Sequence, residues 1–319
     1  MPYAAPASAL KMRRMKNIGI IGIGLIGSSL ARDFLASGDT SLHIYDASPE
    51  HMDTARELNL GHHYHHSAAD LAELCDIIFI CVPVRRIAQV VADIAPHLRY
   101  GTILSDVGSV KAPVFKAVQD INLPDGVHFV PGHPAAGLEY YGPTAGKTGL
   151  FHGKTYALTP DDHTDRAAVS TIRSLIETNT GARVLELDAQ THDRIFAYTS
   201  HMPHILAFAA MNATSRAGAA AGENVLPYAG TTYRDWTRVA RSDAVMWRDI
   251  FLTNTDAIRA SLDLYLDEIQ HLMDMIAHRD EAGITAYINI SGQLRADMDQ
   301  KYGGPGPSQP TPLPDTDKN

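Results

Sequence analysis

Hydrophobic and polar positions follow two different patterns along the chain. Between residues 17 and about 186, short runs rich in β-branched residues alternate with stretches of helical periodicity. The runs are NIGIIGI, SLHIYD, DIIFICVP, GTILSDV, VHFVPG, TYALT and ARVLEL. Strands that alternate with helices in this way form a mainly parallel sheet covered by helices. The first part of the chain is therefore predicted to be an α/β domain.

From about residue 188 the strand pattern stops and long helical periodicity replaces it. The helices of this second, all-α domain are long and rich in Leu, Ile, Met and Tyr. Their apolar surface is larger than a single small domain can bury. Pairing with a second copy, a homodimer, is expected. We predict a flexible leader at 1–15, a first domain at 16–187, a helical domain at 188–300 and a disordered, Pro/Gly-rich tail at 301–319.

Composition narrows the class of protein. The chain has 319 residues, of which 45% are hydrophobic and 20% are charged, enough for a full core and about two domains. Its longest apolar runs are too short to cross a bilayer, so no membrane segment is expected. A net charge of −9, with no basic cluster beyond KMRR, argues against nucleic acid as a partner. The basic residues of the leader follow its weakly apolar part, the reverse of a secretory signal, which favours a cytoplasmic protein; Met15 is an alternative start.

The first chemical motif is GIGLIG, which follows the first predicted strand and opens a helix. Gly22 allows the tight turn, Gly24 lets the backbone approach a pyrophosphate, and Gly27 lets the helix pack on the strand. Asp46 follows 19 residues after Gly27, at the end of the second strand, where a carboxylate can accept hydrogen bonds from ribose hydroxyls. With no arginine directly after Asp46, NAD is preferred over NADP. The domain is thus predicted to be of the Rossmann type, with cofactor-binding candidates Gly22, Gly24, Leu25, Ile26, Gly27, Asp46, Val82, Pro83 and Ser109.

Polar turns follow the later strands at the rim where ligands bind in open α/β sheets. One turn is SDVGSVK, with Asp106, Ser109 and Lys111, and the next holds His133 between a glycine and a proline. A histidine at this rim suits a general base, because its ordinary pKa of about 6.5 is near working pH. Ser109 would orient it or bind the same hydroxyl. The alternative, that His133 only stiffens the turn by bonding a carbonyl, stays open at this point.

Two further features have simple interpretations. Cys75 and Cys81 are interpreted as small core hydrophobes, so no disulfide is expected. The cluster HHYHH at residues 62–66 is expected in a loop between a helix and a strand, with no acid or cysteine at metal-binding spacing. We therefore expect no metal.

Five longer motifs carry a resemblance to a known family. They are GIGLIGSSLA, DVGSVK, GHPAAGLEYYGPTAG, THDRIFAYTSHMPH and YRDWTRVARSDAVMWRDI, and the resemblance that they carry covers roughly residues 16 to 295. In these motifs the chain resembles the prephenate/arogenate (cyclohexadienyl) dehydrogenases of tyrosine biosynthesis. The resemblance implies a Rossmann domain, a helical dimerisation domain and an active site in the cleft between them. It also implies oxidation at the ring carbon that bears the hydroxyl, with loss of the ring carboxylate as CO₂.

The resemblance also implies roles for single residues. His133 matches the family's catalytic histidine, and Ser109 matches a serine near both the nicotinamide and that histidine. Arg238 matches the arginine used against a substrate carboxylate, with Arg234 as a weaker candidate on the same helical face. The substrate-binding candidates are Arg238, His204, Ser200, His201, Trp247 and Arg234. Asp193 and Asp243 are expected only to cap helices or pair locally.

The motif after the histidine departs from the family, which generally has a bulkier residue there and then AG followed by Ser/Thr-Glu. This chain has Ala135, Leu138 and the pair Tyr140–Tyr141 instead, so a preference for prephenate or arogenate stays open. Two other functions also remain. One is another Rossmann-plus-helical enzyme, a β-hydroxyacid dehydrogenase or imine reductase, which needs a lysine or aspartate on the long inter-domain helix. The other is a non-catalytic NAD-binding regulator, which has no need of His133, Ser109 and Arg238 together.

Overall fold

The computed structural model describes residues 16–138 and 140–303. The predicted leader and most of the predicted tail lie outside these residues. The chain divides into two compact units, with the division between Ser261 and Leu262. No helix in the described part of the chain is long and apolar enough to cross a membrane.

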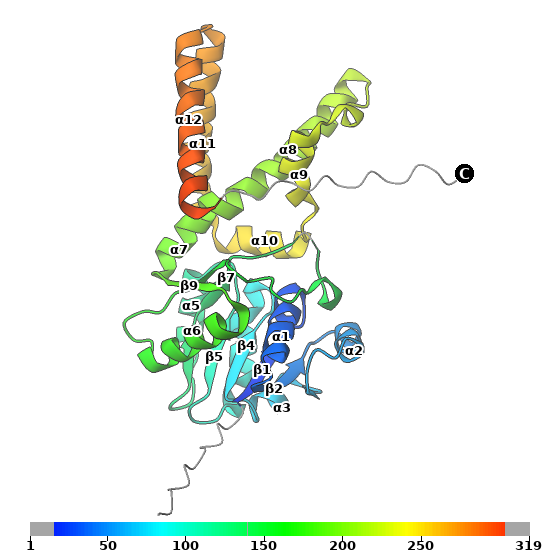
Figure 1. Cartoon of the computed structure of the whole chain (residues 1–319), viewed down its shortest axis with the longest axis vertical. Helices are drawn as coiled ribbons and strands as arrows, with labels where there is room; N and C mark the ends of the chain where they lie inside the picture. Colours follow the sequence, from blue (N-terminus) through cyan, green and yellow to red (C-terminus); the bar gives the residue numbers. More distant parts are fainter. Residues whose placement is uncertain (1–15, 139, 304–319) are drawn as a thin grey trace, which may run out of the picture. The chain divides into compact units, whose positions relative to one another are not determined.

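The first unit contains a six-stranded parallel sheet in the order β3-β2-β1-β4-β5-β6 (Figure 1). Its strands are β1 (Lys16–Ile21), β2 (Thr40–Tyr45), β3 (His63–Tyr64), β4 (Ile77–Ile80), β5 (Ile103–Asp106) and β6 (His128–Val130). The order reverses at β1, which lies between β2 and β4. A reversal of this kind leaves a crevice beyond the carboxyl ends of the two central strands, and that crevice is where doubly wound sheets bind ligands.

Helices cover both faces of this sheet. The helices are α1 (Leu25–Ser37), α2 (Pro49–Glu57), α3 (Ala68–Ala72), α4 (Ile87–Ile94), α5 (Ala112–Gln119) and α6 (Arg166–Thr180). One core joins α1, α2 and α6 through residues such as Phe34 and Ile172, which are fully buried. The other joins α3, α4 and α5 through residues such as Val91 and Val114. The central strands β1, β4 and β5 are largely buried, as strands covered on both faces are, which explains their nearly continuous apolar runs.

The structure contains a second, three-stranded sheet, which the sequence pattern did not distinguish from the first. It consists of β7 (Gly132–Pro134), β8 (Thr155–Leu158) and β9 (Arg183–Glu186), in that order, with β7 antiparallel to β8. The chain turns at Pro131, directly after β6, so that β7 leaves the main sheet. Because β7 contains His133, this change of sheet sets the position of the candidate base.

The predicted change from strands to helices after the α/β part is confirmed. The helices are α7 (Ala189–Phe196), α8 (Met202–Ala221), α9 (Thr231–Thr237), α10 (Ala244–Thr253), α11 (Thr255–Ala277) and α12 (Glu281–Tyr302). Trp247 and Ile250 on α10 pack into the same core as α3, α4 and α5. Figure 1 shows α10 crossing the end of the sheet where β7 lies. In the second unit, Tyr287 of α12 donates its hydroxyl to Glu268 of α11 at 2.9 Å.

The HHYHH cluster differs from the expectation of a plain loop. His63 and Tyr64 form the edge strand β3 and pair with His43 and Ile44 of β2. The Tyr64 hydroxyl donates to the carbonyl of Ala55 at 3.1 Å and so ties the strand to α2. Across residues 16–138 and 140–303, no group of three or more His, Cys, Asp or Glu side chains has the geometry to hold a metal ion.

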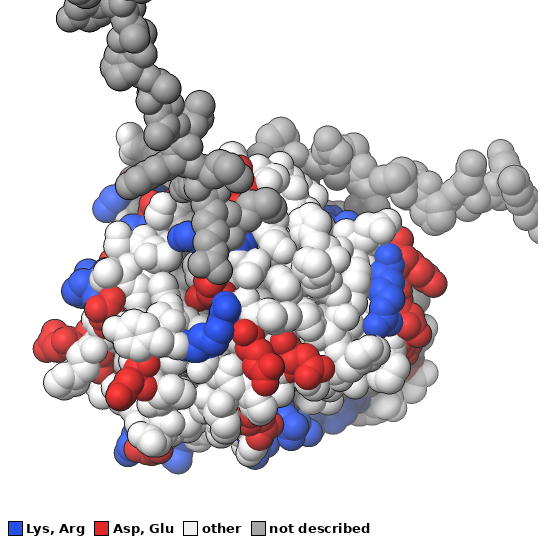
Figure 2. Space-filling view, turned by 90° about the horizontal axis from the view of Figure 1, so that it is seen from below, with Lys and Arg blue, Asp and Glu red and all other residues white. Residues whose placement is uncertain are grey.

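Surface charge is mixed on the face of the first unit that Figure 2 shows. Lysine and arginine side chains alternate there with aspartate and glutamate side chains, separated by uncharged residues. On this face the described residues offer no continuous positive area of the kind that tracks a phosphate backbone.

Candidate active site

The glycine-rich turn between β1 and α1 has the shape that the sequence predicts. Gly22 has a φ of +95°, and a Cβ there would lie 2.5 Å from the carbonyl oxygen of Cys81. A Cβ on Gly27 would lie 2.0 Å from the carbonyl oxygen of Gly22, so only glycine lets α1 start this close to β1. Gly24 has open space around its Cβ position. The turn thus leaves room for a ligand at the N-terminus of α1, where Leu25 and Ile26 begin the helix.

This helix end fits a pyrophosphate for two reasons. The first N–H groups of a helix lack partners within the helix, and the helix dipole places partial positive charge there.

Val82 lies against the same turn, because its Cγ1 would be 3.1 Å from a Cβ on Gly22. Pro83 is exposed and precedes a short turn at Val84–Arg86. Dinucleotide binding by these residues remains a prediction.

Asp46 lies directly after β2 with its carboxylate held in place. Oδ2 accepts the N–H of Ile23 at 2.7 Å, and Oδ1 accepts the N–H of Ser48 at 2.8 Å. The ring of His51 lies at 3.4 Å from Oδ2. The carboxylate is therefore fixed beside the glycine turn, and its remaining lone pairs can accept hydrogen bonds from a ribose.

His133 is buried rather than exposed in a turn. Its exposed fraction is 7%, and its Nδ1 lies 2.8 Å from Nε2 of His192. Its ring also packs on Phe196, with ring centroids 4.5 Å apart. Burial, followed by the charges of His192, Lys111 and His201, holds the pKa of His133 well below 6.5. The expectation of an ordinary pKa was therefore wrong, because a desolvated imidazole favours its neutral form.

A buried ion pair holds the backbone next to His133. The Lys111 ammonium is fully buried, contacts the Asp106 carboxylate, and donates to the carbonyl of Gly132 at 2.8 Å. Asp106 in turn accepts the N–H of Gly132 at 3.2 Å. Burial lowers the pKa of Lys111, while the charge of Asp106 opposes that effect. Ser109 lies in the same turn, partly buried.

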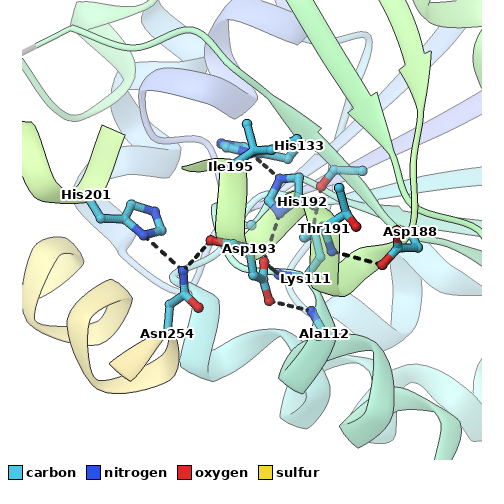
Figure 3. A network of polar contacts seen from close by, with 12 residues as sticks. Lys111, Ala112, His133, Asp188, Thr191, His192, Asp193, Ile195, His201 and Asn254 are labelled. Atoms are coloured by element: carbon cyan, nitrogen blue, oxygen red, sulfur yellow. Dashed lines mark hydrogen bonds and ion pairs between the residues drawn. The ribbon is translucent and has the colours of Figure 1, made fainter. Parts of the chain in front are cut away.

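Nδ1 of His133 is hydrogen-bonded to His192, while the expected roles of Ser109, orienting the histidine or binding the same hydroxyl, stay predictions. Nδ1 of His192 lies 2.8 Å from Oδ1 of Asp193 (Figure 3). Asp193 also accepts the backbone N–H groups of Lys111 and Ala112 at 2.7 and 2.9 Å, so it caps α5 from a distant part of the chain. The expectation that Asp193 pairs only locally was therefore wrong. Asp243, in contrast, does cap its own helix by accepting the N–H of Met246 at 2.6 Å.

The SHMPH motif begins in the last two residues of a π-helical turn between α7 and α8 and continues into the start of α8. Residues 197–201 form one π-helical turn, a feature that is often found at functional sites. His204 hydrogen-bonds to the carbonyl of Ser200 at 2.9 Å and stacks on Trp247, with ring centroids 3.7 Å apart. His201 is fully buried and receives a hydrogen bond from Asn254 at 3.1 Å. Burial lowers the pKa of His201 to about 4.

The two arginine candidates lie in adjoining elements. Arg234 lies in α9 and donates its Nε to the carbonyl of Ala229 at 3.0 Å. Arg238 begins the following 3₁₀ turn, where it is exposed. Burial lowers the pKa of His204, and the positive charge of Arg238 contributes to that effect.

The structure thus brings together His133, His201, His204 and Trp247, and it adds groups that the sequence did not single out. His192, Asn254 and the Asp106–Lys111 pair all belong to one buried polar network around His133. One signal was available in the sequence. His192 and Phe196 are four residues apart and share one face of α7, so this helix turns an imidazole and an aromatic ring in the same direction.

A dinucleotide-binding fold whose switch-point rim holds a buried, neutral histidine defines a class of protein, the nicotinamide-dependent dehydrogenases. The particular family follows from comparison with known proteins. The model of the prephenate dehydrogenase nucleotide-binding domain matches residues 30–186, and the model of the prephenate dehydrogenase dimerization domain matches residues 188–290. The chain belongs to the prephenate dehydrogenase family.

Individual relatives agree with this assignment. The chain is 39% identical over 285 residues to a cyclohexadienyl dehydrogenase of Zymomonas mobilis, covering 89% of this chain and 96% of that protein. It is 30% identical to a prephenate dehydrogenase of Bacillus subtilis, covering 93% of this chain and 80% of that protein.

Solved structures agree as well. A prephenate dehydrogenase from Aquifex aeolicus, crystallised with hydroxyphenyl propionate and NAD⁺, has a TM-score of 0.84 at 29% identity, covering 91% of this chain and 100% of that one. A 3-hydroxyisobutyrate dehydrogenase from Salmonella typhimurium, with a TM-score of 0.52 at 18% identity, shares the fold alone. The predicted family and its enzyme class are therefore confirmed.

Proposed function

We propose that this enzyme uses NAD to oxidise prephenate, arogenate or both, with loss of the ring carboxylate as CO₂. The products are 4-hydroxyphenylpyruvate from prephenate and tyrosine from arogenate. The observation that supports this proposal most is the buried His133, whose Nδ1 is engaged by His192 while Nε2 remains available at the rim of the sheet. A neutral imidazole in this position is the base that oxidation of a ring hydroxyl needs.

The residues at the glycine-rich turn fit NAD. The open space at Gly24 and the N-terminus of α1 suit the pyrophosphate, and Asp46 suits the adenosine ribose. A 2′-phosphate would meet the Asp46 carboxylate, which supports NAD over NADP. When bound, NAD accepts the hydride from the ring carbon that bears the hydroxyl.

His133 handles the proton of the reaction. Its Nε2 takes the hydroxyl proton as the carbon–hydrogen bond breaks, which produces a ring ketone. The bond from the ring to its carboxylate then breaks, CO₂ leaves, and the electron pair makes the ring aromatic. The phenolate oxygen recovers the proton from His133, which returns to its neutral form. Burial supports the first step because it keeps the imidazole unprotonated.

The helical side of the site provides groups for the rest of the substrate. Arg238 suits a carboxylate, since a guanidinium binds that planar anion through two parallel hydrogen bonds. His204 lies in the field of Arg238 and is held flat against Trp247, so it can present its Nε2 to a substrate oxygen. We assign Ser109 to the region of the substrate hydroxyl and His133. We assign Ser200 and His201 to substrate binding beside His204.

The assembly that we propose is a homodimer in the cytoplasm. The family's second domain is described as a dimerization domain. In this chain α11 and α12 expose a large set of apolar side chains: Leu264, Leu266, Ile269, Met273, Ile276, Ile288, Ile290, Leu294, Met298 and Tyr302. Many exposed apolar side chains on two neighbouring helices are typical of an interface.

The two rival functions have less support. A β-hydroxyacid dehydrogenase or imine reductase needs a catalytic lysine or aspartate on the long helix, and α8 contains neither. A regulator that only binds NAD would have no use for a buried base together with Arg238. Wild-type enzyme mixed with NAD and either prephenate or arogenate is expected to form NADH, followed by its absorbance, and not to do so with 3-hydroxyisobutyrate. NADH formed only with the hydroxyacid would refute the proposal.

A further inference from the structure

Three buried side chains form a continuous row of hydrogen bonds at the candidate base. Nδ1 of His133 lies 2.8 Å from Nε2 of His192, and Nδ1 of His192 lies 2.8 Å from Oδ1 of Asp193 (Figure 3). Their exposed fractions are 7%, 0% and 5%. We call these three residues the triad. All three side chains are shielded from solvent, so the position of each proton is set by the hydrogen bonds within the row.

The direction of the hydrogen bonds is set at the Asp193 end. Both oxygens of Asp193 accept backbone N–H groups at the N-terminus of α5, from Lys111 at 2.7 Å and Ala112 at 2.9 Å. These donors and the partial positive charge of the helix end favour an ionised carboxylate. An ionised carboxylate can only accept hydrogen bonds. His192 must therefore carry its proton on Nδ1 and donate it to Asp193.

The proton positions on the two imidazoles then follow. A neutral imidazole has one N–H, so Nε2 of His192 has no proton and can only accept. The group that donates to it is Nδ1 of His133, which leaves Nε2 of His133 with a free lone pair. The state with a second proton on His192 is disfavoured, because burial lowers the pKa of both histidines.

We propose that His192 and Asp193 are positioning residues that hold His133 in the tautomer with Nδ1 protonated and Nε2 ready to accept the substrate proton. This extends the proposed function, since it explains which nitrogen of His133 acts. It also predicts stabilisation of the His133 cation that forms in the reaction, because the Asp193 charge lies two hydrogen bonds away. The other charged or titratable groups that face His133 are Lys111, balanced by Asp106, and His201.

The tautomer can be observed without any substrate. Enzyme labelled with ¹⁵N in its histidines gives different nitrogen shifts for protonated and unprotonated ring nitrogens, and the His133→Asn variant identifies the His133 signals. We expect wild-type His133 to be protonated on Nδ1 and unprotonated on Nε2 near neutral pH. A wild-type His133 with its proton on Nε2 would overturn the proposal. This spectrum needs no substrate, so the proposal about the tautomer and the proposed function can fail separately.

A pair of matched variants tests the consequence for turnover. Asp193→Ala removes the acceptor at the end of the triad, so the Nε2-protonated tautomer of His133 should appear and kcat should fall by about 10²-fold or more. NAD affinity should stay within about twofold, because the nucleotide site lies at α1. Asp188→Ala is the control, because the Asp188 side chain caps α7 through the N–H of Thr191 at 2.9 Å, and its contact with the triad is made by the backbone carbonyl, which alanine keeps and which accepts the N–H of His192 at 2.9 Å. It should keep both kcat and the His133 tautomer.

The spectrum separates a positioning role from a structural one. A fall in kcat in Asp193→Ala with the Nδ1 tautomer of His133 intact would overturn the proposal, since the loss would then come from the missing cap on α5. Unchanged kcat in Asp193→Ala would overturn it as well. If this variant does not fold, the wild-type spectrum still decides the tautomer.

Discussion

The imidazole of His204 lies against the indole of Trp247, with ring centroids 3.7 Å apart and ring planes 24° from parallel. Trp247 is only 6% exposed and packs into the core of the α/β part. The stack therefore connects His204, on the helical side of the site, to that core. The positive charge of Arg238 lowers the pKa of His204. We propose that the arginine, the histidine and the indole form one wall of the substrate site.

Truncating Arg238 tests this wall. In Arg238→Gln the substrate carboxylate loses a charge-assisted contact, so kcat/KM should fall by roughly 30- to 1000-fold, or about 2–4 kcal/mol. Most of the loss should appear in KM if the contact is equally strong in the ground and transition states. Arg238→Lys should recover little, because an ammonium cannot form the planar pair. Arg234→Gln, a change in the weaker of the two arginine candidates, is the comparison, and its kcat/KM should fall less; equal losses in both variants would remove the special role of Arg238.

The Asp46 carboxylate should set the choice of cofactor. Asp46→Ser removes both the ribose acceptor and the repulsion of a 2′-phosphate, so the ratio of kcat/KM for NAD to that for NADP should fall. Because Asp46 also holds the N–H of Ile23, some loss with NAD itself is expected. Steady-state kinetics with both cofactors measures the ratio. Wild-type enzyme that works faster with NADP at equal concentration would contradict the assignment.

Replacing the base should affect turnover more than binding. His133→Asn should lower kcat by roughly 10²- to 10⁴-fold while NAD binding is kept. Since the pKa of His133 is held well below 6.5, the neutral base persists under mildly acidic conditions. Wild-type kcat/KM should therefore stay level as pH falls through 6.5 and decline only at lower pH, where His133 becomes protonated. An Asn variant with normal kcat would leave His133 as a structural residue.

The histidines of the β2–β3 edge predict a loss of stability in acid. His43 is 5% exposed, and its Nδ1 lies 2.9 Å from Nε2 of His65. Burial, with smaller contributions from neighbouring histidines, lowers the pKa of His43 from 6.5 to about 4. Between these values the unfolded chain binds a proton that the folded chain does not. The free energy of unfolding should therefore fall as pH is lowered through this range.

The His43→Phe variant isolates this contribution. It cannot bind the proton, so its free energy of unfolding should depend less steeply on pH, by up to about 1.4 kcal/mol per pH unit. Denaturant titrations between about pH 7 and pH 4 measure the slope. His163→Gln, a change in an exposed histidine, should leave the slope as in the wild type. Identical slopes in His43→Phe and wild type would show that His43 does not titrate differently on folding.

Local signals in the sequence were sufficient for much of the fold. The alternation of strands and helices, the turn at Gly22 and the carboxylate at the end of β2 depend on residues close together in the chain. The second sheet was not separated, because three short strands carry no mark of the sheet they join. The π-helical turn before α8 also lacks a sequence signal of its own.

The candidate site was only partly predictable for a related reason. His133 stood out because it lies in a short motif at the end of a strand. The contacts His133–His192 and Asp193–Lys111 join residues 59 and 82 positions apart, so only the folded chain shows them. The low pKa of His133 has the same origin, because burial by distant elements causes it.

The oxidative decarboxylation itself can be tested by one stoichiometry. Wild-type enzyme is given NAD and prephenate labelled with ¹³C in the ring carboxylate, or arogenate labelled at the same carbon, and labelled CO₂ and NADH are measured together. We expect one labelled CO₂ for each NADH formed with at least one of the two substrates, together with an aromatic 4-hydroxyphenyl product. NADH formed without release of the label, or no NADH from either substrate, would contradict it.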